Sequence, residues 1–259
     1  MFTFWRSKRA RFFLISLIMA GILALLSFPQ YQEYFGLTFV LPFASLLILP
    51  LALGRLGGVE TLTFPVLPFF FSLGASLGQN LFPNFYPAIK IISWAAFLGG
   101  FYILLLALNV FKVGRIRKEK IPLERAAKPV VFIFAFASAF LLLTVLYKFG
   151  FGVVLNSALI FGLIFILAAD AFWFLTTADL LERRFFTAAA LLALAVVQVS
   201  LAFSFIPWKA HLRGISEATF FYSALGVSRA YFEKHLKYTI VLEYILVSLA
   251  VFVLAAVIR

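Results

Sequence analysis

The chain contains a succession of apolar segments of about 20 residues, and this feature limits its fold more than any other. A helix of about 20 apolar residues spans the hydrocarbon core of a bilayer, where only helices and closed barrels satisfy every backbone polar group. With 64% hydrophobic residues, the chain has more apolar surface than a water-soluble domain can bury. The sequence therefore predicts an all-α fold, a polytopic integral membrane helical bundle.

Eight apolar segments are clear, and a ninth decides the topology. The ninth, residues 214–232, is just long enough to span but carries Glu217 and Arg229 near its two ends. With the basic N-terminus inside, counting this segment as a span leaves more Lys and Arg on the cytoplasmic side, as the positive-inside rule favours. We therefore expect nine transmembrane helices, with eight as the alternative. The clear segments lie near residues 12–28, 36–53, 61–78, 88–111, 129–147, 152–176, 185–207 and 238–258.

A basic stretch near the middle of the chain predicts a division into two halves. The formal net charge is +12, and residues 112–128 are rich in Lys and Arg. We expect a four-helix membrane half at 1–111, a cytoplasmic linker at 112–128, and a second half of four or five helices at 129–259. Basic residues at a cytoplasmic face attract anionic lipid headgroups, so we expect these as partners, and no nucleic acid.

The sequence lacks the residues that most enzyme and metal sites need. It has no cysteine and two histidines, which excludes thiolate chemistry and leaves little for a metal site. We expect no catalytic residue, no metal and no cofactor. The run from Gly74 to Gly78 matches the G-x-S-x-G pattern of serine hydrolases, but no strand precedes it, as that motif requires. The same two glycines form a G-x-x-x-G motif, which indicates close helix packing.

Ionisable side chains within apolar segments are costly, so they are the first candidates for a functional site. Asp170 lies near the cytoplasmic end of its segment, and Glu243 lies near the start of the last one. If nine helices span, both carboxylates lie at a similar depth. They can then form an ion or proton site with Arg229 as the counter-charge, or Arg229 can simply pair with one of them to hold helices together.

Polar residues also gather at the expected outer face. A loop after Trp208 is expected to carry four of them, and Lys90 comes from another outer loop. Basic side chains at such a face can bind an anionic solute or headgroup through charge-assisted hydrogen bonds, although an ordinary hydrated loop has the same composition. The four residues of the loop are Lys209, His211, Arg213 and Glu217.

The sequence favours two functions, and neither is enzymatic. A transporter of small solutes, coupled to an ion, is favoured by the proline-containing second and third segments and by the candidate site at Asp170. A membrane-embedded subunit or scaffold of a larger complex is favoured by short loops and small residues at packing positions. An intramembrane enzyme of lipid or peptide chemistry is the third, weaker alternative. In each case we expect a multi-pass protein of the cytoplasmic membrane with its N-terminus inside.

The side of the C-terminus distinguishes nine spans from eight. With nine spans and an internal N-terminus, a reporter that is active only in the cytoplasm stays silent when it is fused after Arg259. The same reporter fused within the basic stretch 112–128 serves as the positive control. An active reporter at the C-terminus would rule out the nine-span topology.

Overall fold

The computed structural model describes residues 7–81, 86–117, 122–176 and 182–258, and in these residues all regular structure is helical. The expected all-α, polytopic bundle is confirmed. Eight helical segments are long and apolar enough to cross a membrane, and they coincide with the eight clear segments of the sequence. They are Lys8–Leu26, Phe35–Leu53, Glu60–Leu81, Pro87–Ile116, Leu123–Phe149, Val153–Thr176, Arg183–Phe203 and Tyr238–Ile258.

Residues 210–232 form one further long helix, α10 (Ala210–Phe232). Its 23 residues fall within the range of 19 to 30 residues of the eight segments, but it is not one of the helices that are apolar enough to cross a membrane. The reason is its composition, since Arg213, Glu217 and Arg229 all lie on it. A span at this position remains a prediction.

The chain divides into two compact units, Met1–Phe134 and Ala135–Arg259. The sequence predicts the division at residues 112–128, whereas the two units meet inside helix α7 (Pro122–Phe149). The first part of α7 belongs to unit 1 because Phe134 packs edge-on against Phe71, with ring centroids 5.0 Å apart.

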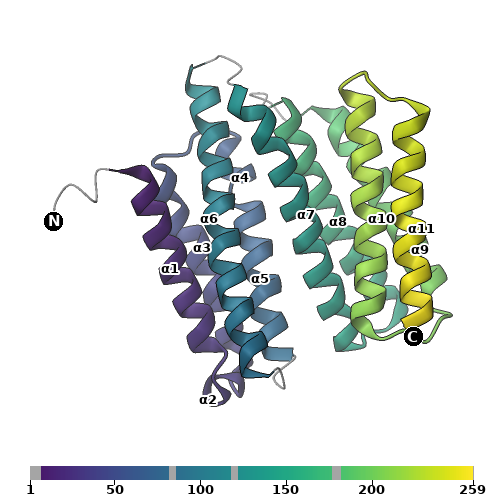
Figure 1. The fold of residues 1–259 in the computed structure, drawn as a ribbon, viewed down its shortest axis with the longest axis horizontal. Coiled ribbons are helices and arrows are strands. Elements are labelled where there is room, and N and C mark those ends of the chain that lie inside the picture. The colour runs from purple at the N-terminus through teal and green to yellow at the C-terminus, as the bar shows by residue number, and fades with distance from the viewer. Residues whose placement is uncertain (1–6, 82–85, 118–121, 177–181, 259) are drawn as a thin grey trace. The chain divides into compact units, whose positions relative to one another are not determined.

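The predicted linker is partly helical. Its first residues continue helix α6 as far as Arg117, and its last residues begin α7 at Pro122. Residues 118–121 lie outside the described part of the chain. Unit 1 thus contains α1 (Lys8–Leu26), α2 (Pro29–Gln32), the 3-10 helix η2 (Phe35–Phe39), α3 (Val40–Leu53), α4 (Glu60–Thr63), α5 (Val66–Leu81), α6 (Pro87–Arg117) and the start of α7 (Figure 1).

Prolines interrupt the third segment, whereas those of the second lie within helix α3. Helix α4 ends before Pro65 and α5 begins directly after it, because proline has no N–H to continue the helical ladder. Pro42 lies in the first turn of α3, where no donor is needed. Pro50 lies inside α3, which continues to Leu53 and ends at Gly54, a residue with φ of 80°.

Basic side chains of unit 1 cover the C-terminal end of α3. The Lys112 Nζ donates hydrogen bonds to the carbonyl oxygens of Leu53 and Arg55, at 2.7 and 2.6 Å. The Arg11 Nη2 donates to the Ala52 carbonyl at 2.8 Å. The last carbonyls of a helix have no partner within the helix and carry partial negative charge, so cations stabilise them. Part of the positive charge at this end therefore has a structural role.

The close helix contacts differ from those expected at Gly74 and Gly78. Gly74 is buried in α5, but a Cβ added at Gly78 would meet no heavy atom within 4 Å. Ser76, between them, donates a hydrogen bond to the Thr38 carbonyl at 2.8 Å, which ties α5 to η2. It lies on a helix and not on the strand-to-helix turn of a hydrolase. A close contact in unit 1 is at Gly100, where a Cβ would lie 3.3 Å from Phe71.

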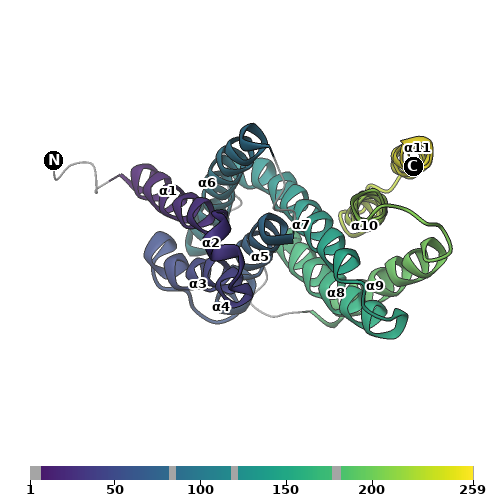
Figure 2. The same ribbon diagram turned by 90° about the horizontal axis from the view of Figure 1, so that it is seen from below.

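Unit 2 contains the end of α7 and the helices that carry most of the ionisable candidates. The rings of Phe172, Phe185 and Phe232 pack against one another and join three of its helices. Helices α10 and α11 run side by side along their lengths (Figure 1), and α10 lies between α11 and the pair formed by α8 and α9 (Figure 2). The further helices of this unit are α8 (Val153–Thr176), α9 (Arg183–Phe203) and α11 (Tyr238–Ile258).

Candidate functional site

A network of charged and hydroxyl side chains joins three helices of unit 2. It begins on α10, where Arg213 and Glu217 are four residues apart and therefore lie on the same face of the helix. The Arg213 Nε lies 3.0 Å from the Glu217 Oε1, and the Glu217 side chain is fully buried. The guanidinium is thus the counter-charge that a carboxylate needs in an apolar interior.

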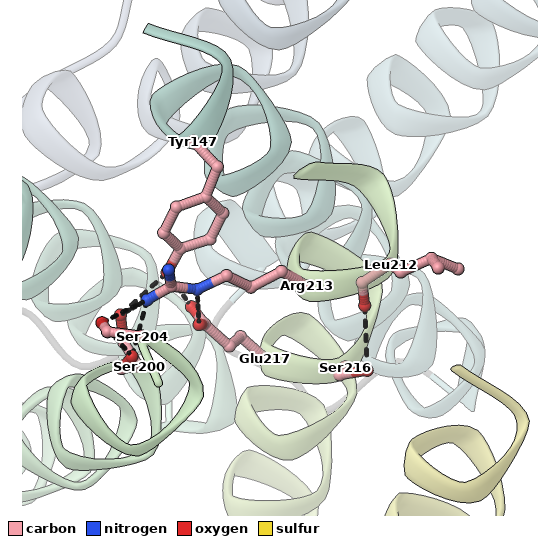
Figure 3. A network of polar contacts seen from close by, with 7 residues as sticks. All are labelled: Tyr147, Ser200, Ser204, Leu212, Arg213, Ser216 and Glu217. Atoms are coloured by element: carbon pink, nitrogen blue, oxygen red, sulfur yellow. Dashed lines mark hydrogen bonds and ion pairs between the residues drawn. The ribbon is translucent and has the colours of Figure 1, made fainter. Parts of the chain in front are cut away.

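Two serines of α9 bind the other edge of the guanidinium (Figure 3). The Arg213 Nη2 donates to the Ser200 carbonyl at 2.6 Å, to the Ser200 Oγ at 3.1 Å and to the Ser204 Oγ at 3.0 Å. Ser200 and Ser204 lie at the C-terminal end of α9, where exposed carbonyls favour a positive charge. Arg213 therefore connects the end of α9 with Glu217 on α10.

Tyr147, on α7, closes the network. Its hydroxyl donates a hydrogen bond to the Glu217 Oε2 and lies 2.8 Å from the Ser200 Oγ. Its ring lies beneath the Arg213 guanidinium, whose Cζ is 3.9 Å from the ring centroid. This is a cation–π contact, which strengthens when water is excluded. Both carboxylate oxygens of Glu217 are therefore held, one by Arg213 and one by Tyr147.

The close approach of α7 and α10 depends on Gly214. A Cβ at this position would collide with the Thr144 side chain, and it would lie 3.0 Å from the Thr144 backbone nitrogen. Thr144 is one helical turn before Tyr147 on α7, and Gly214 is one turn before Glu217 on α10. The missing side chain of Gly214 thus allows the Tyr147 hydroxyl to reach the Glu217 carboxylate.

The chemistry of this network is that of a buried carboxylate that can exist in two protonation states. The charged form is stabilised by Arg213 and by the hydrogen bond from Tyr147, and burial opposes it. If a proton binds to Glu217, the ion pair with Arg213 is lost, while the bonds from Arg213 to Ser200 and Ser204 remain available. Protonation therefore breaks an ion pair within α10 and removes the charged acceptor of the Tyr147 hydroxyl on α7, while the contacts of Arg213 with the end of α9 stay in place.

The structure brings together only part of the expected outer cluster. The expected loop after Trp208 is wrong beyond Lys209, because α10 begins at Ala210, directly after Lys209 as its N-cap residue. His211, Arg213 and Glu217 therefore lie on a helix.

Within this cluster, Arg213 and Glu217 form the ion pair, whereas the side chains of Lys209 and His211 are exposed. Lys90 belongs to unit 1, on α6. The Arg213 guanidinium already has protein partners, so it is not an open site for an anionic solute.

The three residues of the other expected site have different surroundings. Asp170 is 4% exposed, and neither of its carboxylate oxygens forms a hydrogen bond within the described part of the chain. Glu243 is exposed on α11. Arg229 forms an ion pair with Glu233, one helical turn later, at 3.2 Å. No hydrogen bond joins Asp170 to Glu243 in the described residues.

Sequence reasoning missed Tyr147, Ser200 and Ser204. Tyr147 lies near the end of a strongly apolar helix, and serines in such helices usually bond their own backbone, as Ser204 does with the Ser200 carbonyl at 3.0 Å. The spacing of Arg213 and Glu217 was the available signal, since an acid and a base four residues apart on a helix predict an ion pair.

Removing one partner of the buried pair must cost more than removing both. We expect Arg213→Gln to lower the free energy of unfolding by about 3–5 kcal/mol at neutral pH, because the buried Glu217 must then either stay charged without a counter-charge or take up a proton on folding. The double variant R213Q/E217Q loses less of its free energy of unfolding than R213Q does. The loss of stability in R213Q becomes smaller as the pH falls, since protonation neutralises Glu217. Thermal unfolding of the purified protein in detergent measures all three variants, and additive losses would contradict the pairing.

Comparison with known proteins places the chain in a family. The model of the family described as "Protein of unknown function (DUF5656)" matches residues 47–258. This range includes Tyr147, Ser200, Ser204, Arg213 and Glu217. No curated protein and no solved structure matches the chain. Because the family model covers most of the sequence, the protein belongs to the family of unknown function DUF5656.

Proposed function

We propose that the protein is an ion-coupled transporter, in which Glu217 binds and releases a proton and Arg213 is its counter-charge. The observation that carries this proposal is the complete burial of Glu217 among apolar helices, with each carboxylate oxygen held by a different helix partner. Ionisable residues inside membrane segments are costly and are typical of proton relays. Glu217 takes the role that the sequence suggested for Asp170 and Glu243.

The coupling follows from the two protonation states. With Glu217 charged, α10 is held to α7 through Tyr147, and Arg213 bridges α10 to the end of α9. A proton taken from the aqueous side neutralises the carboxylate and removes its attraction to Arg213. The guanidinium then keeps its bonds to Ser200 and Ser204 alone. The Tyr147 hydroxyl of α7 also loses its charged acceptor on α10. Packed helices change between discrete arrangements, so a weaker contact between α7 and α10 can alternate the position of α10.

A second function is supported by a different feature of the same network. The Nε and Nη2 of Arg213, both carboxylate oxygens of Glu217 and the hydroxyl of Tyr147 have partners within the chain, which is also what a rigid, non-catalytic subunit of a larger membrane complex requires. Buried ion pairs in general contribute little net stability compared with apolar residues of the same volume. This comparison favours the transport role over a purely structural one.

The remaining features of the proposal concern the membrane. We place α10 as a ninth span, because its 23 residues are at least as many as the 21 of α9 and of α11, because it runs beside α11, and because its Arg213 and Glu217 neutralise each other. The N-terminus then lies in the cytoplasm, and the protein resides in the cytoplasmic membrane. Anionic lipid headgroups are the partners proposed for the basic inner face. No enzymatic step is proposed.

A pH step tests the proton site without knowledge of the cargo. Proteoliposomes adsorbed on a solid-supported membrane report the transient current that accompanies proton binding inside a protein. We expect a current in the wild type and its loss in Glu217→Gln, which cannot take up a proton. The variant E33Q is the matched control, because Glu33 is exposed at the end of a short helix in unit 1.

Two further variants make the result decisive. The double variant R213Q/E217Q has no buried charge at this point, so it must also lack the current even if E217Q alone folds poorly. The variant D170N removes the other buried carboxyl group and is expected to keep the current. A current that survives in folded E217Q, or that disappears in D170N alone, would overturn the assignment of Glu217.

A further inference from the structure

A groove in unit 2 lies between α9, α10 and α11, next to the network of Arg213 and Glu217. Its volume is about 650 Å³, within the range of sites for small molecules. None of the described side chains that line it is an acid, a lysine, an arginine or a histidine. Apolar side chains of all three helices form most of its wall, among them Val199, Phe203, Phe220, Val227, Ile245 and Leu249.

The polar groups in the groove are hydroxyls. Ser248 of α11 donates a hydrogen bond to the Ser223 Oγ of α10 at 2.8 Å, so the proton of Ser223 remains available for a guest. Ser216 and Ser228 donate to carbonyls of their own helix and keep lone pairs that can accept a hydrogen bond. The groove can therefore bind a hydroxyl or carbonyl group, but it offers no counter-charge to an ion.

The groove is elongated along α10. From Ser216 to Ser228 the lining face of α10 extends over about 18 Å at 1.5 Å per residue, more than half the thickness of a hydrocarbon core. Phe203 and Phe252 stack at one end, and the ring of Trp208 packs against both, at 5.0 and 5.3 Å. Tyr244 lies toward the other end, where the absence of a side chain at Gly226 makes room for its ring.

We propose that this groove binds a neutral, single-chain lipophilic molecule that carries a hydroxyl or carbonyl group. Its apolar chain lies along α10 and α11, and its polar group reaches the serine hydroxyls. A phospholipid is a poorer match, because its charged headgroup has no counter-charge in the groove. As a statement about cargo, this inference rests on the proposed transport function.

The groove shares its walls with the proton site. Ser216, which lines the groove, directly precedes Glu217, and Val199, which also lines it, directly precedes Ser200. Any displacement of α9 against α10 caused by a change at Arg213 therefore moves both walls of the groove. This arrangement couples the protonation of Glu217 to the space available to the guest.

Trp208 provides a direct measurement of binding, because its ring contacts two residues of the groove. The probe is a long-chain alcohol with two bromine atoms at mid-chain, which quenches tryptophan emission at short range. The full chain is reconstituted in phosphatidylcholine vesicles without a pH gradient. The emission of Trp208 is obtained as the difference between the wild type and W208F. We expect saturable quenching of this emission.

A matched pair of substitutions tests whether the quenching arises in the groove. Ala224→Phe places a ring inside it, since Ala224 is a half-buried lining residue. We expect A224F to weaken the apparent affinity by about tenfold or more, the effect of overfilling a packed site. Leu246→Phe is the control, because Leu246 is exposed on α11 and does not line the groove. It must leave the affinity unchanged.

Two further probes distinguish a neutral ligand from a charged one and from a membrane phospholipid. The brominated carboxylate of the same chain length should bind more weakly than the alcohol, because the groove has no cation. Dibrominated phosphatidylcholine in the vesicle should quench without saturation and equally in A224F. Non-saturable quenching by the alcohol, or quenching that A224F leaves unchanged, would overturn the inference.

The binding measurement is independent of proton coupling. If the alcohol fails to bind while the proton current of the wild type persists, the cargo assignment alone is wrong. If the alcohol binds while the current is absent, the groove is a lipid-binding site and the transport function fails.

Discussion

The ion pair of Arg213 and Glu217 is the interaction on which the proposed activity of unit 2 depends. It places two opposite charges on α10, which is less apolar than the helices on either side of it. A lone carboxylate at this position would be driven to the neutral form by burial. Because Arg213 and Tyr147 hold it, the charged form has a defined set of partners, and protonation removes its charge attraction to Arg213.

The helices around the pair are arranged to support it. Gly214 brings α10 against α7, and the serines at the end of α9 receive the guanidinium. The groove on the adjoining face of α10 carries hydroxyls but no charge. The charges and the groove thus adjoin along α10, since Phe220 and Ala224 of the groove follow Arg213 and Glu217 at three- and four-residue spacings. This proximity is suited to a neutral, lipophilic cargo whose movement is coupled to a proton bound next to it.

Hydropathy alone predicted the helices well. It did not predict which side chains of neighbouring helices contact one another, because helix packing determines those contacts. The eight clear apolar segments correspond to eight helices because the length of an apolar run is a local property. The rotation of each helix is not local in this sense. Where nearly every position is apolar, the sequence does not indicate which side of α7 or α9 faces α10. Tyr147, Ser200 and Ser204 were therefore not predictable as partners of Glu217.

Because the sequence does not indicate which helices are neighbours, the candidate sites were predicted only in part. Arg213 and Glu217 were identified, but in a loop, because the low hydropathy around them resembles that of a loop. Asp170 was identified correctly as a carboxyl within an apolar helix, and it is buried. Its association with Glu243 was inferred from depth alone, and depth does not determine which helices are neighbours. The glycines that carry close contacts, Gly214 and Gly226 in unit 2, belong to no short motif that the sequence displays.

Infrared difference spectroscopy of the reconstituted protein tests the central claim, that Glu217 changes its protonation state inside the bundle, most directly. The account predicts that acidic-minus-alkaline spectra of the wild type contain a stretching band of a protonated carboxyl group in an apolar environment, that it shifts in heavy water, and that it is missing in E217Q. Identical spectra for the wild type and E217Q would contradict the account, because Glu217 would then keep one protonation state throughout and could not couple a proton to movement.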